Sequence, residues 1–144
     1  MKLRRYFIVL SLVLLFCCKP GPEPIQYGFD GCHYCSMTIV DKQHASEFVT
    51  RKGKVYKFDA SECMINFIRD IERATVALYL VNDYNNPGVL VDAKQATYLI
   101  SENIPSPMGA YLTAFNSREE AELARESNKG ILLTWEELNQ KFED

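Results

Sequence analysis

Short runs of strand-forming residues, separated by polar turn clusters, set the tightest limit on how this chain can fold. The runs are rich in β-branched and aromatic residues, which favour strands over helices. Gly, Pro and Asn fill several of the gaps between the runs, as in residues 82–88, and these residue types favour turns. The predicted strands are residues 37–40, 45–50, 55–58, 75–81, 89–91, 96–100, 111–115 and 131–133.

A first helix is predicted between the third and fourth of these strands. Cys63, Phe67 and Ile71 recur there at helical spacing. Asp59 precedes them and is followed three residues later by Glu62, which is the pattern of an N-cap acid with a capping-box glutamate. We therefore expect the helix to begin directly after Asp59.

The second half of the chain repeats part of this plan. Asn116 is the predicted N-cap of a second helix, with Glu119 three residues later, and a third helix follows near the C-terminus. Junctions between strands and helices often look alike, so the repeat also has an ordinary explanation. We predict an α+β fold of two similar small lobes, each an antiparallel-type sheet with a packed helix. The second and third helices are placed at residues 120–127 and 134–142, and the lobes at about residues 27–83 and 84–144.

Residues 1–17 have the pattern of a signal peptide. A basic start precedes the apolar residues 6–16, which are too few for a stable membrane span. Three of the 16 Lys and Arg residues lie in this segment, so its removal leaves 13 basic residues against 19 acidic ones, a net charge of −6. The basic surface that nucleic-acid binding needs is absent from this composition.

The end of the apolar stretch resembles a lipobox, in which the new N-terminal cysteine receives lipid. Cleavage before Cys18 leaves the small Cys17 at position −1, whereas cleavage before Cys17 would leave the bulky Phe16 there. We therefore predict lipidation of Cys18, the alternative being a secreted protein with two chance cysteines. Residues 18–26, rich in proline and glycine, would form an extended tether to a domain spanning residues 27–144.

The remaining sulfur side chains gather at a few places instead of scattering through the core. Thiolate and thioether sulfur are soft ligands that select Cu(I), whereas zinc sites use Cys, His and carboxylate groups. The mixture of the two sulfur types therefore predicts a Cu(I) site. The candidate ligands are Cys32, Cys35 and Met37 in one segment, Cys63 and Met64 at the start of the first helix, and Met108 in a Pro-Met-Gly loop.

Several of these residues also have an ordinary structural interpretation, although a Pro-Met-Gly loop is not an obvious core position for Met108. Cys32 and Cys35 can form a structural disulfide or a redox pair, although thioredoxin-like pairs open a helix and a strand-like run follows here. Cys63 and Met64 fit a buried helix face, as most such residues do. Helix capping explains Asp59 without any ligand role.

At these residues the chain resembles the NosL family, the copper-chaperone lipoproteins associated with nitrous oxide reductase assembly. The matching pieces appear in the family's order and cover nearly the whole chain after the tether. They are residues 32–37, Phe58 and Asp59 with Cys63 and Met64, and Pro107, Met108 and Gly109 with Ala114 and Phe115.

The resemblance implies a monomeric, two-lobed α+β protein that binds Cu(I) through sulfur. The family's ligands map onto Cys35 and Met37, with Met108 next. The partner that receives the ion would be an ABC-transporter complex or nitrous oxide reductase itself. The chain departs from the family at Ser36, where the family has glycine, and Ser36 would be strained if this position has a positive φ.

Taken together, these features predict a lipid-anchored protein of the cell envelope that faces the periplasm. It would bind Cu(I) and deliver it to a partner without catalysing a reaction, since paired carboxylates, nucleophile–base motifs and phosphate-binding loops are not found. Two other functions stay open at this point. One is an envelope thiol–disulfide oxidoreductase that uses Cys32 and Cys35, and the other is a disulfide-stapled domain that binds protein partners.

Overall fold

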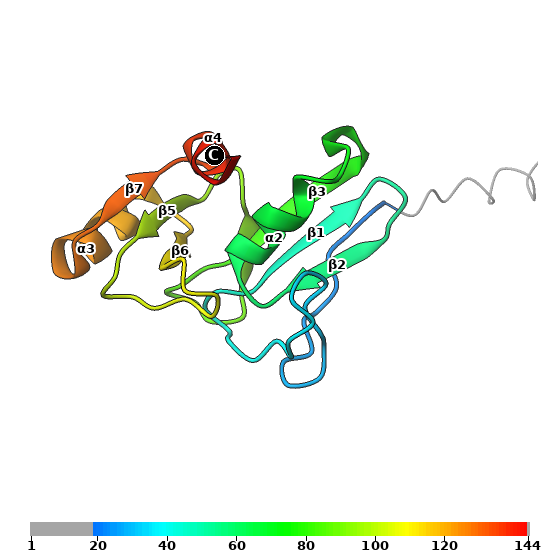
Figure 1. Ribbon diagram of the computed structural model, residues 1–144, viewed down its shortest axis with the longest axis horizontal. Helices are drawn as coiled ribbons and strands as arrows, with labels where there is room; N and C mark the ends of the chain where they lie inside the picture. The colour runs from blue at the N-terminus through cyan, green and yellow to red at the C-terminus, as the bar shows by residue number, and fades with distance from the viewer. Residues whose placement is uncertain (1–18, 144) are drawn as a thin grey trace, which may run out of the picture.

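The computed structural model describes residues 19–143, which form the predicted α+β fold (Figure 1). The predicted signal peptide and Cys18 lie outside these residues. Within them, no helix combines the length and the apolar character needed to cross a membrane. The elements are β1 (Ser46–Thr50), β2 (Val55–Phe58), α2 (Ser61–Ile68), the 3-10 helix η2 (Arg73–Thr75), β3 (Val76–Asn82), β4 (Leu90–Asp92), β5 (Thr97–Ile100), β6 (Leu112–Phe115), α3 (Arg118–Asn128), β7 (Ile131–Leu133) and α4 (Trp135–Glu143).

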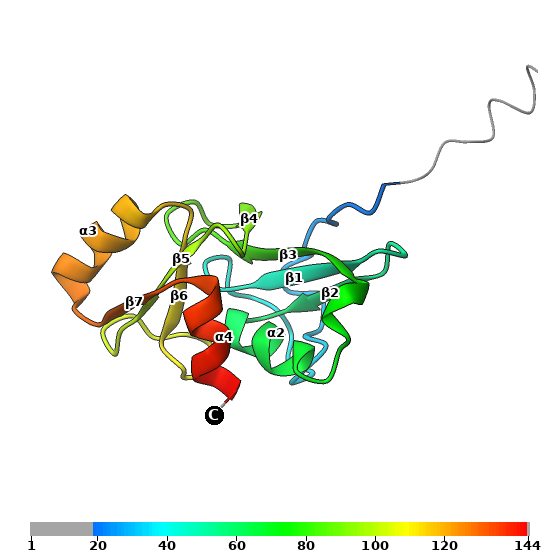
Figure 2. The same ribbon diagram turned by 90° about the horizontal axis from the view of Figure 1, so that it is seen from above.

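The first lobe is a four-stranded antiparallel sheet in the order β2-β1-β3-β4, and α2 covers one of its faces (Figure 2). Side chains alternate between the two faces of a strand, so Phe48 of β1 points toward the helix. Its ring lies 5.7 Å from that of Phe58 and 5.9 Å from that of Phe67 on α2. This aromatic packing fixes α2, and with it the residues of its first turn, against the end of β2.

The opposite face of this sheet is covered by the start of the described chain. Glu47 points to this face, where its Oε1 accepts a hydrogen bond of 3.0 Å from the backbone N–H of Glu23. Lys57 donates to the carbonyl of Pro24 at 2.9 Å, and Ile25 is buried. The predicted tether therefore has no regular structure over residues 19–26, but part of it is bound to the sheet.

The second lobe is a three-stranded antiparallel sheet in the order β6-β5-β7 with α3 against it. In both lobes, a β-hairpin leads into a helix and then into a third strand. In each sheet, the first strand of the hairpin lies between the second strand and the third. The repeat expected from the sequence is therefore present. The cap of α3 lies one residue later than predicted, because Ser117, not Asn116, accepts a hydrogen bond of 3.2 Å from the N–H of Glu120. The first sheet also extends to Asp92, past the predicted lobe boundary at residues 83 and 84.

The two lobes share one hydrophobic core. The ring of Tyr79 on β3 lies 5.4 Å from that of Trp135 on α4, and Trp135 lies 6.2 Å from Tyr98 on β5. Phe48 from the first lobe and Leu138 from α4 are completely buried in the same cluster. Helix α4 lies beside α2 (Figure 2), so the last element of the chain closes the junction between the lobes.

The predicted strand at residues 37–40 is wrong. This segment folds back on residues 28–32 as an irregular hairpin, and a single bridge joins Gly31 to Thr38. The N–H of Cys32 donates to the carbonyl of Met37 at 2.8 Å, and the chain reverses between them through a turn. Strand propensity is easily overridden by such local geometry.

Candidate metal centre

The turn of the 28–39 hairpin carries two of the three cysteines of the described chain. Cys32 and Cys35 lie on either side of it, and the N–H of Ser36 donates to the carbonyl of Cys32 at 3.0 Å. The backbone N–H of His33 donates to the carbonyl of Lys57 on β2 at 2.9 Å. This bond attaches the turn to the edge of the first sheet, next to the point where β2 ends.

Four side chains from two distant segments converge there. The sulfur atoms of Cys32, Cys35 and Cys63 and a carboxylate oxygen of Asp59 all lie within 4.8 Å of one another. Asp59 Oδ1 accepts hydrogen bonds from the Cys63 thiol at 3.3 Å and the Cys35 thiol at 3.5 Å. All three cysteines are free thiols. We refer to these four residues as the cysteine cluster.

Asp59 belongs to this cluster instead of capping α2, so the predicted cap is wrong. The N-cap is Ala60, which makes no side-chain cap hydrogen bond. Asp59 lies in the short connection from β2 to α2, and Cys63 lies in the first turn of the helix, four residues later. The sequence analysis gave Asp59 a capping role alone. The spacing of four residues between Asp59 and Cys63 is the signal that could have placed Asp59 at the site, because residues four apart at a helix start lie on one face.

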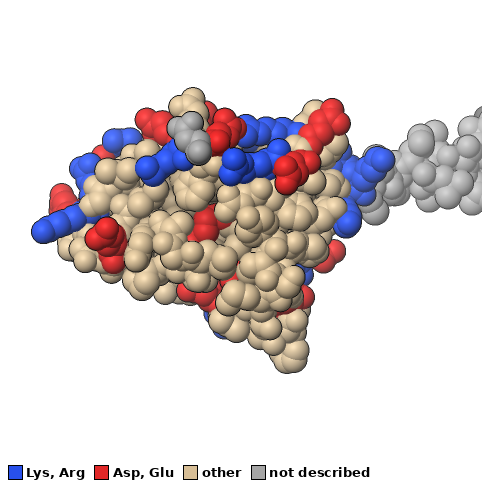
Figure 3. Space-filling model, viewed as in Figure 1, with Lys and Arg blue, Asp and Glu red and all other residues tan. Residues whose placement is uncertain are grey.

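The cluster is open to solvent on one side only. Cys32 and Cys63 are 3% and 1% exposed, whereas Cys35 is half-buried. The hairpin that carries Cys35 projects from the body of the molecule, and Figure 3 shows that this projection is largely uncharged. Phe29, Tyr34 and Met37 are exposed apolar residues of the same hairpin. An ion held by the cluster would therefore be reachable from solvent at Cys35.

Hydrogen bonding and burial give the three thiols different acidities. Hydrogen bonding to Cys63 lowers the pKa of Cys32, against the opposing effect of burial. The same hydrogen bond, together with burial, raises the pKa of Cys63. Burial is the main cause that raises the pKa of Cys35. The Cys32 sulfur is thus the first to become a thiolate, and thiolates are the form that binds metal.

The predicted methionine ligands lie in different environments. Met64 is fully buried in the hydrophobic core beside Cys63 on α2, which fits its ordinary role as a core residue. Met37 and Met108 are 52% and 40% exposed, so their thioethers are at the surface. His33 instead bonds to β2, because its Nδ1 accepts from the N–H of Lys57 at 3.1 Å.

Ser36 has a positive φ, the conformation in which this serine was expected to be strained. Its φ is 65°, in the left-handed region that glycine occupies at little cost. The strain is located directly between Cys35 and Met37, at the turn that presents both side chains.

The donor set of the cluster fits a soft or borderline metal ion. Thiolates suit Cu(I), and three thiols with one carboxylate also match the ligand types of zinc. Among residues 19–143, this is the one group of three or more His, Cys, Asp or Glu side chains that is arranged to hold an ion. The chemistry that the geometry supports is metal binding at a site with a single open edge.

Comparisons with known proteins point in the same direction. The family model described as NosL matches residues 27–142. The copper-binding lipoprotein NosL of Stutzerimonas stutzeri is 28% identical over 127 residues, which cover 82% of this chain and 67% of that protein. The crystal structure of the copper chaperone NosL from Shewanella denitrificans has a TM-score of 0.72 at 22% identity, covering 82% of this chain and 95% of that one. The last similarity shows that the fold is shared.

Proposed function

Because the chain belongs to the NosL family, as the match over residues 27–142 shows, we propose that it binds one copper ion as Cu(I) and passes it to a partner protein. The ligands in this proposal are the thiolates of Cys32, Cys35 and Cys63. The observation that carries it is the convergence of these three free thiols within 4.8 Å, from a hairpin and a helix start 28 residues apart. A relative of the chain is named for copper binding, and soft thiolates select Cu(I).

Copper binding at this site would displace protons from the thiols. Cys32 has the lowered pKa and is the first ligand, while Cys35 and Cys63 must lose protons as the ion binds. Asp59 adds a negative charge beside the cation without being a soft ligand itself. Affinity for Cu(I) should therefore fall as the pH falls through the range in which the thiols are protonated.

Release would proceed by ligand exchange at the open edge. Cys32 and Cys63 are buried, so an incoming sulfur of the partner reaches the ion beside Cys35. Met37, two residues further along and exposed, would offer a further sulfur ligand during the exchange. In such an exchange the ion is never free in solution, and no covalent bond of the protein is made or broken. The role is that of a carrier and not of an enzyme.

The proposal is tested by competition with a chromogenic Cu(I) chelator, using the reduced full chain in mild detergent without oxygen. We expect one Cu(I) to be retained, and Cys35→Ser or Cys63→Ser to weaken its binding by at least about tenfold, the loss of one ligand being of the order of 1.4 kcal/mol or more. Met64→Leu is the matched control, a conservative change beside Cys63 that should leave the affinity unchanged. Zinc is added in a parallel titration, because it suits the same donors. Full retention of copper by a Cys35→Ala, Met37→Ala double variant would overturn the assignment.

One observation favours a second function, that of a thiol–disulfide oxidoreductase. The lowered pKa of Cys32 is a feature of nucleophilic redox cysteines. However, this thiol is 3% exposed, while the reachable Cys35 has a raised pKa, which is the reverse of what attack on a substrate disulfide requires. The insulin-reductase assay separates the two functions, and we expect no activity above that of a Cys32→Ser variant.

The location and the destination of the ion also belong to this proposal. The relative from Stutzerimonas stutzeri is named a lipoprotein, and residues 1–17 have a signal-peptide pattern that is followed directly by Cys18. We propose a lipid anchor on Cys18, a place in the envelope facing the periplasm, and delivery to the copper sites of nitrous oxide reductase or its ABC-transporter complex. Labelling with palmitate should be lost in Cys18→Ala and kept in Cys17→Ala.

A further inference from the structure

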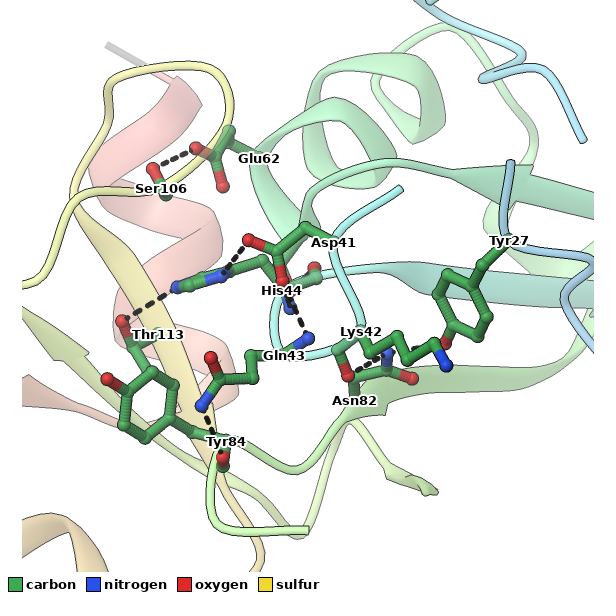
Figure 4. A network of polar contacts seen from close by, with 11 residues as sticks. Tyr27, Asp41, Lys42, Gln43, His44, Glu62, Asn82, Tyr84, Ser106 and Thr113 are labelled. Carbon is green, nitrogen blue, oxygen red and sulfur yellow. Dashed lines mark hydrogen bonds and ion pairs between the residues drawn. The ribbon is translucent and has the colours of Figure 1, made fainter. Parts of the chain in front are cut away.

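The start of the described chain is fastened to the first sheet, which leaves only a short connection to the proposed lipid anchor. The backbone N–H of Glu23 donates to the carboxylate of Glu47 on β1 at 3.0 Å. The hydroxyl of Tyr27 accepts a hydrogen bond of 2.7 Å from the side chain of Asn82 on β3 (Figure 4). Cys18 lies five residues before Glu23. Since an extended chain spans at most about 3.6 Å per residue, a lipid on Cys18 would begin within about 18 Å of the sheet.

These contacts also give the direction in which the chain leaves the sheet. Tyr27 bonds to the last residue of β3, which lies beside the start of β1, and Glu23 bonds further along β1, at Glu47. Traced back from Tyr27, the chain therefore runs along β1 toward the turn of residues 51–54. Figures 1 and 2 show that the described chain begins at this end of the molecule, where β1 leads into β2. A lipid on Cys18 would enter the bilayer next to this turn.

The turn between β1 and β2 is basic and exposed. It carries three positive charges in four residues, those of Arg51, Lys52 and Lys54. None of the three forms an ion pair in the part of the chain that the structure describes. The Lys54 ammonium lies 4.4 Å from the centre of the Tyr56 ring, and Arg51 donates to the carbonyl of Ala74 at 2.7 Å. These contacts hold the two side chains without neutralising their charges. We refer to this segment as the basic turn.

The surroundings of the basic turn do not cancel its charge. The connection from α2 to η2 lies beside it, because the N–H of Arg51 donates to the carbonyl of Thr75 at 2.8 Å. Residues 69–73 of this connection contain two basic and two acidic side chains, so they add no net charge. The chain from Cys18 onward is acidic as a whole, with 13 basic residues against 19 acidic ones. Its positive charge is therefore concentrated where the chain leads to the anchor, and positive charge at a membrane surface attracts anionic lipids.

We propose that the basic turn, together with the exposed Lys19, rests on anionic lipid headgroups of the bilayer that holds the anchor, and so orients the domain on the membrane. This inference rests on the proposed lipid on Cys18 and does not depend on copper. The cysteine cluster lies at the other end of β2, since Asp59 comes directly after Phe58. The four residues of β2 separate the two by about 13 Å. This orientation turns the open edge at Cys35 away from the headgroups.

The apolar hairpin offers the opposite orientation as a rival. Phe29 is 88% exposed, and Tyr34 and Met37 are exposed beside it, so this hairpin could in principle enter a bilayer. The short connection to Cys18 favours the basic turn, because it leaves the sheet at that end. The Cys35 thiol lies in the hairpin, so its reactivity on a membrane distinguishes the two orientations.

The test uses the lipidated, reduced and metal-free protein in vesicles of phosphatidylcholine alone, or of equal parts of phosphatidylcholine and phosphatidylglycerol. Lysines are acetylated with acetic anhydride and quantified by mass spectrometry, because an amine held on an anionic surface is shielded and kept protonated. We expect Lys52 and Lys54 to react at least about fivefold more slowly on the anionic vesicles. Lys129, between α3 and β7, should react equally on both and is the internal control. Salt at about 1 M should remove the difference, since it screens charges beyond about 3 Å.

Variants separate the charge of the turn from other causes of protection. In the double variant Arg51→Gln, Lys54→Gln, the remaining Lys52 should lose most of its protection. Lys141→Gln removes an exposed charge on α4 instead and should keep that protection. Alkylation of Cys35 by iodoacetamide should proceed at the same rate on both kinds of vesicle.

Equal acetylation of Lys52 on the two kinds of vesicle, or protection that persists in the double variant, would overturn the inference. Slowed alkylation of Cys35 with Lys52 unprotected would overturn it in favour of the apolar hairpin. Failure of the proposed anchor is seen separately, as protein that does not float with the vesicles, and it removes the inference as well. Copper binding by the cysteines is measured independently of all these outcomes.

Discussion

At the scale of single residues, Asp59 adds to the effects of burial and of Cys32 that raise the pKa of the accessible thiol, Cys35. The pKa of Cys35 is raised first by burial and then by its charged neighbours, Cys32 and Asp59. A carboxylate beside a thiol disfavours the thiolate, because two negative charges repel in a partly buried site. Removal of the Asp59 charge should therefore lower the pKa of Cys35 and increase its thiolate fraction at neutral pH.

Asp59→Asn tests this relation without removing a soft ligand. We expect the rate of Cys35 alkylation by iodoacetamide to reach its half-maximal value at a lower pH than in the parent protein. Asp30→Asn is the control, since Asp30 lies in the same hairpin but pairs with Lys57 outside the cluster. A pH profile that does not move, or one that moves equally in the control, contradicts the role of Asp59. Cu(I) affinity at high pH should be kept, because carboxylate is a poor ligand for a soft ion.

Ser36 offers a second prediction at this scale. A φ of 65° costs a non-glycine residue about 1–2 kcal/mol in the folded state. Glycine avoids this cost, but its more flexible unfolded chain lowers the stability by about 0.5–1 kcal/mol. Ser36→Gly should therefore raise the free energy of unfolding of the metal-free protein by up to about 1 kcal/mol. Urea denaturation of the reduced protein measures the change, and Ser36→Ala, which keeps the strain, should show no gain.

At the scale of elements, most strands follow from alternation and turn residues alone. β1 and β2 fall within the predicted residues 45–50 and 55–58, because a hairpin turn separates two runs that fit a half-buried sheet. The segment of residues 37–40 has the same composition but no strand, since the turn at Ser36 and the bonds of Cys32 decide its path. A high strand propensity means that a segment fits well into a sheet, and residues 37–40 have no neighbouring strand with which to pair.

The start of α2 shows a different limit. Asp59 and Glu62 have the spacing of a capping box, and each makes its contacts elsewhere, Asp59 with two thiols and Glu62 with Ser106. Those contacts come from segments distant in the sequence. The local sequence pattern therefore predicted correctly that a helix begins after Asp59. The contacts of Asp59 and Glu62, however, are determined by residues that are distant in the sequence.

Strand β1 carries a buried acid whose titration is linked to stability. Burial raises the pKa of Glu47 to about 7 from an ordinary value of 4.5. The folded state then holds a proton that the unfolded chain releases between these values, so the stability contributed by this proton falls as the pH rises from about 4.5 to about 7. Above pH 7 the folded state contains a charged, poorly solvated carboxylate.

Glu47→Gln should remove this loss. The amide keeps an acceptor oxygen for the N–H of Glu23 and cannot ionise. Relative to the parent protein, we expect the variant to gain about 1–3 kcal/mol of unfolding free energy on going from pH 5 to pH 8, one pKa unit being worth about 1.4 kcal/mol. Urea denaturation at the two pH values gives this difference, and Glu126→Gln, a change at an exposed acid, is the control. An equal pH response in parent and variant would contradict the buried titration.

At the scale of the whole molecule, the fold brings together what the sequence separates. The sequence identified Cys32, Cys35 and Cys63 by residue type, and the structure joins them because the hairpin turn is bonded to β2, which leads directly into α2. Asp59 was missed because a capping role explained it locally. Met64 and Met108 share a residue type but not an environment, since one is in the core and the other at the surface. Sequence alone does not show that difference.

The shared core predicts that the two lobes unfold as one unit. Tyr79 and Trp135 meet across the junction, and Leu138 of α4 is fully buried in the same cluster as Phe48. Trp135 is the single tryptophan of the chain, so its fluorescence reports α4 and the junction of the lobes, whereas the metal site lies in the first lobe. We expect the thermal transitions seen by fluorescence and by far-ultraviolet circular dichroism to coincide.

Copper bound in the first lobe should then stabilise the second. An ion that binds only the folded state adds about 2.7 kcal/mol when its free concentration is 100 times its dissociation constant. In one cooperative unit this raises the Trp135 midpoint as much as the circular dichroism midpoint. Leu138→Ala, which leaves a cavity in the shared core, should lower both midpoints together by a destabilisation of about 2–5 kcal/mol. If copper moves the circular dichroism transition and leaves the Trp135 transition in place, the lobes unfold independently and the prediction of one cooperative unit is wrong.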